Sequence, residues 1–189
     1  TGVQTCALPI YYPATCKPDD VAAADAASFK AYAYGDIFCR GIYPQYYLNG
    51  FNGVDFDSII RPGDMETIAG IETDFLSLTY YMSNVCAGTN TSNTLTNTMQ
   101  SNPYLPKTKY GWTIDPYGFY HLLMDFHHRY QKPILILENG MGTPDKLEED
   151  GCVHDSYRID YLRSHIEAMA NAVADGVTMV GYCTWSAFD

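Results

Sequence analysis

The sequence predicts an α/β fold built on a parallel sheet. Residues 133–138 and 177–182 are short apolar runs with the length and composition of buried strands, and residues 74–81 form a third run rich in aromatic and apolar side chains. Between successive runs lie segments with the three-to-four-residue spacing of helices. The order strand, helix, strand, helix, strand predicts parallel strands joined by right-handed crossovers.

Composition limits the classes of protein to which the chain can belong. With 189 residues, of which 47% are hydrophobic and 17% charged, it has the makeup of a globular protein and not of a disordered one. A net charge of −11 argues against nucleic acid or an anionic membrane as the principal partner. The sequence has no apolar run of about eighteen residues and therefore predicts no membrane span.

The aromatic content is high, with 17 Tyr, 8 Phe and 2 Trp. Flat rings pack against the apolar faces of sugars while their polar tips hydrogen-bond hydroxyls, so an acidic, aromatic-rich chain suits a carbohydrate cleft. The alternative is a tyrosine-rich core and surface without such a role. Composition leaves both open.

The six cysteines do not have the pattern of a metal or redox site. None has Cys-x-x-Cys spacing and no histidine lies at zinc-finger spacing, so we expect no metal and no cofactor. We interpret the cysteines as free thiols in a reducing compartment, which predicts a cytoplasmic protein. They occupy positions 6, 16, 39, 86, 152 and 183.

The start of the chain has neither the charged-then-apolar pattern of a secretion signal nor a good opening for a helix or strand. We expect residues 1–10 to be a non-native leader that lies outside the fold. Residues 11–189 are then expected to form one partial domain.

The first predicted helix begins at residues 17–20, Lys-Pro-Asp-Asp, because acidic residues favour the positive end of the helix dipole and alanines follow. Its apolar stripe is expected at Phe29, Ala33 and Ile37. The Gly-Ile-Tyr-Pro sequence at residues 41–44 ends it. A second, short helix is expected near residues 65–69.

The segment from Ser83 to about Asp115 is rich in Ser, Thr and Asn, and we interpret it as a long binding loop. Asp115 and the proline after it then start a helix. One apolar face of this helix carries Phe119, Leu122, Leu123 and Phe126.

The most regular helix of the sequence follows an acidic loop and is expected to be capped by Asp155 and ended by Gly176. Apolar side chains recur in it at spacings of three and four, which predicts the buried face. These side chains are Ile159, Leu162, Ile166, Met169 and Val173.

Three predicted strands end in candidate functional residues, namely Tyr81, Glu138 and Trp185. The carboxyl ends of parallel strands meet at one rim, where barrel and open-sheet enzymes place their chemistry. Trp112 lies in the long loop above the same rim. For Glu138 the alternative is a turn in which Asn139-Gly140 supplies the positive-φ positions, and that tripeptide alone favours the turn.

Together these four side chains suit the cleavage of a glycosidic bond. A carboxylate can attack the anomeric carbon, a phenol can orient it, and indoles can hold a sugar ring. Ordinary burial is the alternative for each ring taken singly. Their convergence at one rim favours the functional interpretation.

At these residues the chain also resembles glycoside hydrolase family 1, and within it the bacterial 6-phospho-β-glucosidases. The resemblance extends from about Tyr12 to Asp189, with several motifs in the family's order. The motifs are residues 74–83, 102–105, 111–116, 130–133, 138–140, 155–166, 175–177 and 181–186.

The resemblance implies a (β/α)8 barrel, of which this chain would be the incomplete C-terminal part with about three βα units. It also implies a retaining mechanism with Glu138 as nucleophile and Tyr81 as the residue that orients it. Trp185 matches the indole under the sugar being cleaved, and Trp112 matches the leaving-group platform. Thr79 replaces the Asn or Ser usual in the family, which leaves any polar role there open.

Two parts of the family pattern do not occur here. The family's acid/base glutamate lies in an Asn-Glu-Pro motif, and this sequence has no Asn-Glu pair. The phosphate-binding Ser, Lys and Tyr would follow the last strand, beyond Asp189. We therefore expect a piece of a retaining glycosidase for 6-phospho-β-glucosides that is inactive by itself.

Two alternatives remain open. One is a β-glucosidase or β-galactosidase of the same family that acts on unphosphorylated sugars. The other is a non-catalytic carbohydrate-binding or structural protein that kept part of the barrel. The expected partner in either enzyme is a small glycoside, and the sugar, the linkage and the oligomeric state stay open.

Overall fold

The computed structural model describes residues 6–7, 9–51, 53–91 and 94–186. Its main sheet has four parallel strands in the order β1-β3-β6-β7. The bounds of these strands are β1 Cys6–Ala7, β3 Leu76–Tyr80, β6 Ile134–Asn139 and β7 Met179–Thr184.

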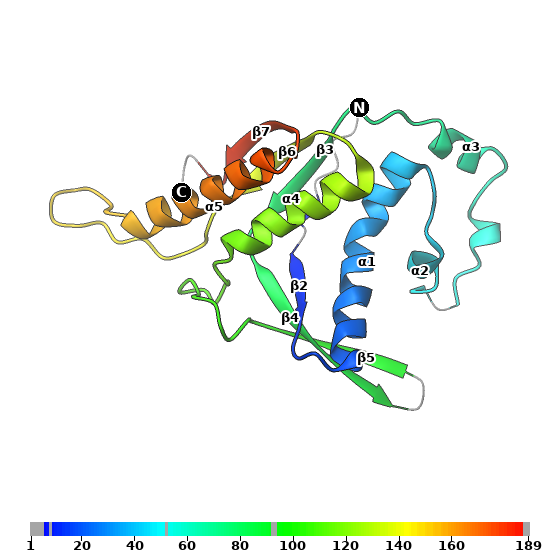
Figure 1. Cartoon of the computed structure of the whole chain (residues 1–189), viewed down its shortest axis with the longest axis horizontal. Helices are drawn as coiled ribbons and strands as arrows, with labels where there is room; N and C mark the ends of the chain where they lie inside the picture. The colour runs from blue at the N-terminus through cyan, green and yellow to red at the C-terminus, as the bar shows by residue number, and fades with distance from the viewer. Residues whose placement is uncertain (1–5, 8, 52, 92–93, 187–189) are drawn as a thin grey trace.

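Two long helices connect the last three strands of this sheet and cover the same face of it (Figure 1). They are α4, Pro116–Tyr130, and α5, Ser156–Ala174. The succession β3, α4, β6, α5, β7 with parallel pairing confirms the predicted order of strands and helices.

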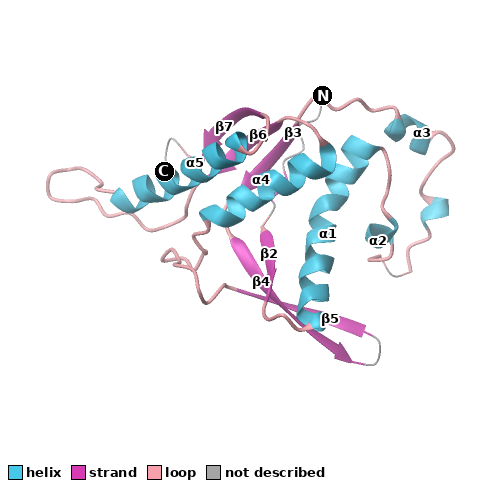
Figure 2. Ribbon diagram, in the orientation of Figure 1, coloured by secondary structure: helices cyan, strands magenta, loops and turns pink. Residues whose placement is uncertain are grey.

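A second sheet combines strands in the order β2-β4-β5, and its hairpin projects away from the main sheet (Figure 2). Its strands are β2 Ile10–Pro13, β4 Ser83–Thr91 and β5 Thr94–Gln100. β2 runs parallel to β4, and β4 pairs antiparallel with β5. The expected long binding loop was therefore wrong over residues 83–100, where alternating β-branched threonines favour strands despite the polar composition.

The residues at the start of the chain take part in both sheets. Cys6–Ala7 pairs with Leu78 and Thr79 of β3, and Ile10 opens β2 with only 8% of its surface exposed. Residues 6, 7 and 10 thus belong to the folded structure, contrary to the expectation that residues 1–10 lie outside it. Whether those ten residues are a non-native leader stays a prediction.

Helix α1, Pro18–Arg40, packs along β2 and β4 of the second sheet (Figure 1). Small buried side chains, Ala23, Ala24 and Ala27, allow it to approach Cys86 of β4 closely. Gly41 ends the helix in the left-handed conformation, as expected for a glycine C-cap.

Part of the expected apolar stripe on α1 was wrong. Ala33 and Ile37 are buried, but Phe29 is 42% exposed and packs on the ring of Tyr46 instead of in the core. The short helices α2, Gln45–Leu48, and α3, Asp64–Ala69, follow, with the 3-10 turn η1, Phe56–Ser58, between them. α3 confirms the short helix expected near residues 65–69.

The contact between α1 and α4 depends on a glycine and a buried ion pair. A Cβ at Gly35 would lie 2.4 Å from the ring of Tyr130, so only glycine leaves room for that ring. Beside it, fully buried Asp36 accepts two hydrogen bonds from Arg129, at 3.0 and 2.7 Å, and one from Tyr46. These bonds hold the pKa of Asp36 below its usual value despite burial, so the carboxylate stays charged.

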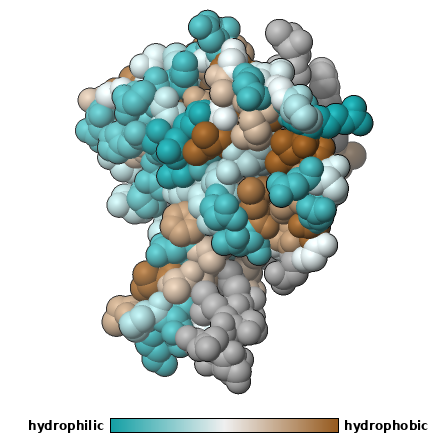
Figure 3. Space-filling view, turned by 90° about the vertical axis from the view of Figure 1, so that its right-hand side faces the viewer, coloured by the Kyte–Doolittle hydropathy of each residue, from teal (hydrophilic) through white to brown (hydrophobic). Residues whose placement is uncertain are grey.

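Rings also hold the segment after α1 together. Tyr34, Tyr47, Phe51 and Phe56 form a chain of edge-to-face contacts with centroids 5.1–6.2 Å apart. Figure 3 shows the side on which α2 and α3 lie, with hydrophobic surface emerging between hydrophilic patches. Exposed apolar residues of this segment are Ile42, Phe51, Val54, Ile59 and Ile71.

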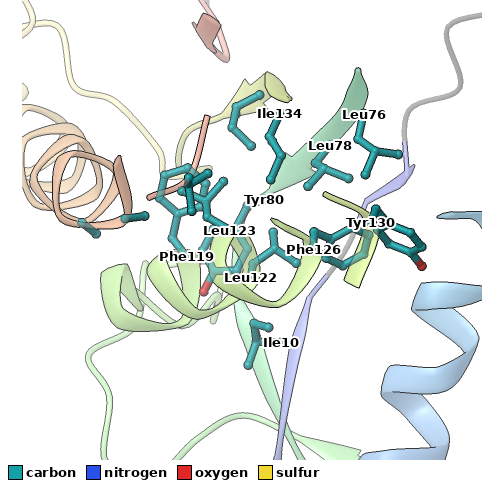
Figure 4. Close-up of a cluster of buried hydrophobic side chains, with 14 residues drawn as sticks. Ile10, Leu76, Leu78, Tyr80, Phe119, Leu122, Leu123, Phe126, Tyr130 and Ile134 are labelled. Atoms are coloured by element: carbon teal, nitrogen blue, oxygen red, sulfur yellow. The ribbon is translucent and has the colours of Figure 1, made fainter. Parts of the chain in front are cut away.

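The main core lies between the four-stranded sheet and helices α4 and α5 (Figure 4). The predicted apolar face of α4 is confirmed, because all four of its side chains are at most 2% exposed. The cluster consists of Ile10, Leu76, Leu78, Tyr80, Phe119, Leu122, Leu123, Phe126, Tyr130, Ile134, Ile136, Ala168, Ala172 and Val177. In the described part of the chain, no helix is long and apolar enough to cross a membrane.

The predicted buried face of α5 was only partly correct. Leu162 and Met169 are half-buried, and Met169 packs against the core. Ile159, Ile166 and Val173 are 53%, 43% and 47% exposed. The helix instead buries a neighbouring face, whose small and aromatic side chains fit closely against the sheet. That face consists of Tyr161, His165, Ala168 and Ala172. Asp155 does precede the helix, but its side chain pairs with Arg158 and makes no capping bond.

His165 lies fully buried between α5 and the sheet. Its ring stacks on Tyr161 at 3.9 Å, and its Nδ1 lies 2.8 Å from the Tyr161 carbonyl oxygen, so Nδ1 carries the proton and donates. Burial lowers the pKa of His165 to about 4. The folded chain therefore holds a neutral imidazole near neutral pH.

The lowered pKa of His165 predicts that the folded chain loses stability in mild acid. Its pKa is about 4 when folded and 6.5 when unfolded, so between these values the unfolded state binds more protons. The stability contribution is complete above about pH 6.5 and falls by about 2 kcal/mol on going to about pH 5. Thermal unfolding at both pH values should show a smaller pH effect in His165→Phe. The control His128→Gln, at an exposed position, should behave as the parent chain, and an unchanged pH effect in His165→Phe would contradict the assignment.

Candidate active site

The position of Glu138 depends on a bulge in β6. Leu78 pairs with Ile136 and Thr79 pairs with Glu138, so one step along β3 matches two steps along β6. The pairing of β6 with β7 skips a residue in the same place. Leu137 is therefore an extra residue.

The bulge reverses the side of the sheet to which Glu138 points. Ile134 and Ile136 are fully buried against the helices, and strict alternation would place Glu138 on that same face. After the bulge, Asn139 is the residue buried on the helix side, and Glu138 lies on the opposite face beside Thr79. The strand was also expected to be buried on both faces, but Leu135 and Leu137 are only half-buried because α4 and α5 cover one face.

Tyr81 donates a hydrogen bond of 2.6 Å from its hydroxyl to Oε2 of Glu138. Tyr81 directly follows β3, so the two side chains come from the carboxyl ends of neighbouring parallel strands. Burial and this hydrogen bond raise the pKa of Tyr81 well above its usual value. The phenol therefore stays protonated and donates to the carboxylate.

Both tryptophans of the chain contact the ring of Tyr81. Trp112 meets it with centroids 5.6 Å apart and planes at 67°, and Trp185 meets it at 5.8 Å and 89°. Trp185 directly follows β7 and is 45% exposed. The structure thus brings together all four side chains that the sequence placed at one rim.

A tight hairpin holds Trp112 over this rim. The Trp112 carbonyl accepts a bond of 2.8 Å from the Thr108 amide, and the Trp112 amide donates to the Thr108 hydroxyl at 3.3 Å. Gly142 lies under the hairpin, where a Cβ would come within 3.2 Å of the Tyr110 ring and 3.3 Å of the Trp112 ring. The exposed ring of Tyr110 therefore lies at the same glycine as Trp112.

A carboxylate with a phenol donor and two half-exposed indoles can attack an electrophilic carbon of a ring held against the aromatics. Among the residues that the structure describes, no group of three or more His, Cys, Asp and Glu side chains is arranged to hold a metal ion.

A sequence model of the family described as "Glycosyl hydrolase family 1" matches residues 3–189. The chain belongs to glycosyl hydrolase family 1. Its parallel sheet with α4 and α5 on one face is accordingly part of a (β/α)8 barrel, as the resemblance implied.

Relatives with curated names support the same family. The chain is 40% identical over 197 aligned residues to the aryl-phospho-β-D-glucosidase BglA of Bacillus subtilis, covering 100% of this chain and 41% of that protein. It is 39% identical to the phospho-cellobiase of Klebsiella oxytoca, covering 95% and 39% respectively. The chain thus spans about two fifths of the length of these relatives.

Solved structures of family 1 proteins share the fold. A β-glucosidase from Exiguobacterium marinum aligns with a TM-score of 0.84 and 33% identity, covering 96% of this chain and 41% of that one. The family 1 β-glucosidase from Thermotoga maritima aligns with a TM-score of 0.81 and 30% identity, covering 96% and 40%.

Sequence reasoning missed the part of this family 1 site that lies behind the sheet. The Asn139 side chain is fully buried and donates from Nδ2 to the Tyr80 carbonyl at 2.7 Å and to the Tyr161 hydroxyl at 3.1 Å. Its Oδ1 accepts from the Tyr182 hydroxyl at 2.7 Å. The apolar periodicity of α5 gave no signal for Tyr161. The Glu-Asn-Gly motif could have signalled Asn139, but it resembles a turn.

The alternative interpretation, a turn with positive φ at Asn139-Gly140, is contradicted by the backbone. Among the described residues neither has a positive φ, and Asn139 belongs to β6. Gly140 is needed because a Cβ there would lie 1.9 Å from the carbonyl oxygen of Trp185. The two chains approach so closely that the Trp185 amide donates to the Asn139 carbonyl at 2.9 Å.

Gly140→Ala should therefore displace the chain that carries Trp185. We expect a loss of about 1–3 kcal/mol in the free energy of unfolding, typical of overpacking, together with a change in acrylamide quenching of Trp185. Quenching is measured in a Trp112→Phe background, where Trp185 is the single tryptophan. Gly50→Ala, at an exposed glycine, is the control. Parent-like stability and quenching in Gly140→Ala would show that the close approach does not constrain Trp185.

Proposed function

We propose that this chain supplies the nucleophile of a retaining β-glycosidase that hydrolyses 6-phospho-β-glucosides. The observation that carries the proposal is the hydrogen bond from Tyr81 to Glu138, with Trp112 and Trp185 at the ring of Tyr81. Membership of glycosyl hydrolase family 1 supports it.

In the proposed first step, Glu138 attacks the anomeric carbon of the sugar. Tyr81 binds Oε2, so Oε1 forms the new bond to that carbon while the bond from the carbon to the glycosidic oxygen breaks. The leaving oxygen takes a proton from an acid that the motifs of this chain do not provide. Water then hydrolyses the glycosyl ester and releases the Glu138 carboxylate, with retention at the anomeric carbon.

Tyr81 orients the nucleophile in this chemistry. Its hydroxyl fixes the rotation of the carboxylate, so Oε1 is directed at the substrate. The indoles of Trp185 and Trp112 provide apolar faces for the sugar and the leaving group, the roles that the family resemblance implies.

The names of the relatives favour phosphorylated substrates. The aryl-phospho-β-D-glucosidase and the phospho-cellobiase are 39–40% identical over 95–100% of this chain. By contrast, a 1,4-β-D-glucan glucohydrolase of Thermotoga neapolitana is 41% identical over only 67% of it, and the two β-glucosidases of known structure are 30–33% identical. Hydrolysis of unphosphorylated β-glucosides is the second candidate, and those two β-glucosidases support it. A phosphorylated sugar and the free thiols inferred from cysteine spacing both agree with a cytoplasmic location, which stays a prediction.

The nucleophile is tested in a complete barrel, made by joining the chain to the remaining segment of a relative such as BglA. Glu138→Gln should lower kcat by about 1,000-fold or more, because covalent catalysis loses its nucleophile. A 2-fluoro glycoside with a good leaving group should form an adduct that peptide mass spectrometry locates at Glu138.

The control for this experiment is Glu149→Gln, at an exposed position in the loop before α5, which should keep parental turnover and labelling. The 189-residue chain expressed alone should show no turnover, since retaining hydrolysis requires a second carboxyl group about 5 Å from the first. Activity within tenfold of the parent in Glu138→Gln, or an adduct elsewhere, would refute the role.

Substrate charge is tested with the same complete barrel. It should hydrolyse 6-phosphorylated aryl β-glucosides at least about 100-fold better, in kcat/KM, than the unphosphorylated compounds. A site built to pair a phosphate leaves its cations uncompensated when that group is missing. Equal kcat/KM values would favour the second candidate, and failure to hydrolyse either substrate would favour a non-catalytic protein.

A further inference from the structure

The chain carries a set of hydrogen bonds behind the sheet that converges on the backbone of the candidate site. Tyr81 lies just beyond the end of β3, where strand pairing no longer determines the position of its peptide groups. The Tyr80 carbonyl accepts from Nδ2 of Asn139 at 2.7 Å. The Tyr81 carbonyl accepts from the Tyr161 hydroxyl at 3.3 Å. At the end of β3, two side chains therefore bind the backbone carbonyls in place of a paired strand.

Asn139 connects the three strand ends that carry the site. It is the neighbour of Glu138, its side chain reaches the Tyr80 carbonyl, and its own carbonyl accepts the Trp185 amide at 2.9 Å. All the hydrogen-bonding atoms of its amide group are engaged, because Oδ1 accepts from Tyr182. A buried amide with complete partners has a single favourable orientation.

Tyr161 connects this arrangement to α5. It is 2% exposed, its ring stacks on His165, and its hydroxyl both accepts from Asn139 and donates to the Tyr81 carbonyl. Burial raises the pKa of Tyr161 above its usual value, so the hydroxyl keeps the proton that it donates. Through Tyr161, α5 therefore fixes the position of the Tyr81 peptide group relative to the Asn139 side chain.

We propose that Asn139 and Tyr161 are positioning residues that hold the backbone of Tyr81 and Glu138 from behind the sheet and so set the Tyr81–Glu138 hydrogen bond. Neither side chain lies on the face that carries Glu138. Their effect on catalysis rests on the proposed glycosidase function, whereas their effect on the geometry of the site does not.

The decisive variant is Tyr161→Phe, which removes one hydroxyl and keeps the ring on His165. In the complete barrel it should lower kcat by about 10- to 100-fold with a small change in KM, because displacement of the reacting groups weakens the transition state more than binding. Circular dichroism verifies the fold.

A matched control separates positioning from general stability. Tyr130→Phe also removes a buried hydroxyl that donates to a main-chain carbonyl, that of Tyr32 at 2.7 Å, but this bond joins α4 to α1. It should lower the melting temperature and leave kcat unchanged. Tyr182→Phe removes the bond to Oδ1 of Asn139 and leaves both carbonyl contacts, so its effect on kcat should be smaller than that of Tyr161→Phe.

A double-mutant cycle supplies the sharpest test. Once Tyr81→Phe has removed the phenol, Tyr161→Phe has no Tyr81–Glu138 bond left to position and should cause little further loss of kcat. Additive losses in the double variant would overturn the proposal, and so would a parental kcat in Tyr161→Phe.

A second measurement keeps the inference testable if the proposed function fails. In the 189-residue chain with Trp112→Phe, acrylamide quenching of Trp185 should change on adding Tyr161→Phe and stay constant on adding Tyr130→Phe. A parental barrel without activity would refute the glycosidase proposal alone. Unchanged quenching in Tyr161→Phe would refute the positioning role, whatever the activity.

Discussion

One extra residue in β6 determines the arrangement of the whole candidate site. Without the bulge at Leu137, strict alternation would turn Glu138 toward the helices and Asn139 toward the open face. A carboxylate would then be buried in the apolar layer next to α4 and α5, where its charge is costly, and an amide would face the open side. With the bulge, each residue meets suitable partners: a phenol donor for the carboxylate, and one carbonyl and two hydroxyls for the amide. The bulge therefore gives the buried amide its hydrogen-bond partners and leaves the reactive carboxylate on the open face of the sheet.

The structural and reactive roles fall on adjacent residues of one short motif. Glu138 faces the open side, Asn139 connects strand ends behind the sheet, and Gly140 leaves room for the Trp185 carbonyl. Each role depends on a different physical property: charge, complete hydrogen bonding and the lack of a side chain. Substitution at any of the three positions would consequently disturb the same few atoms through a different cause.

The sequence predicted those features that depend on composition and order along the chain. Apolar runs located β3, β6 and β7, strand polarity placed Tyr81, Glu138 and Trp185 at one rim, and the apolar face of α4 was correct. It could not predict features that depend on three-dimensional pairing. The hydrophobic periodicity of β6 does not reveal the bulge. The β4–β5 hairpin has the polar composition of a loop. Its β-branched threonines nevertheless favour paired strands. On α5, apolar spacing indicated only part of the buried face, because most of the residues that pack against the sheet are Tyr, His and Ala, which contribute little to a hydrophobicity pattern.

The hairpin that carries Trp112 is fixed by its own backbone bonds to Thr108 and rests on Gly142, while the hydrogen bonds around Asn139 lie on the other side of the sheet. The two parts meet at Trp112, whose ring contacts the ring of Tyr81. The exposed tip of the hairpin makes no such contact. In a laboratory library, diversity is therefore best placed at the exposed Lys109 and Tyr110, and excluded from Trp112 and from the Glu-Asn-Gly motif.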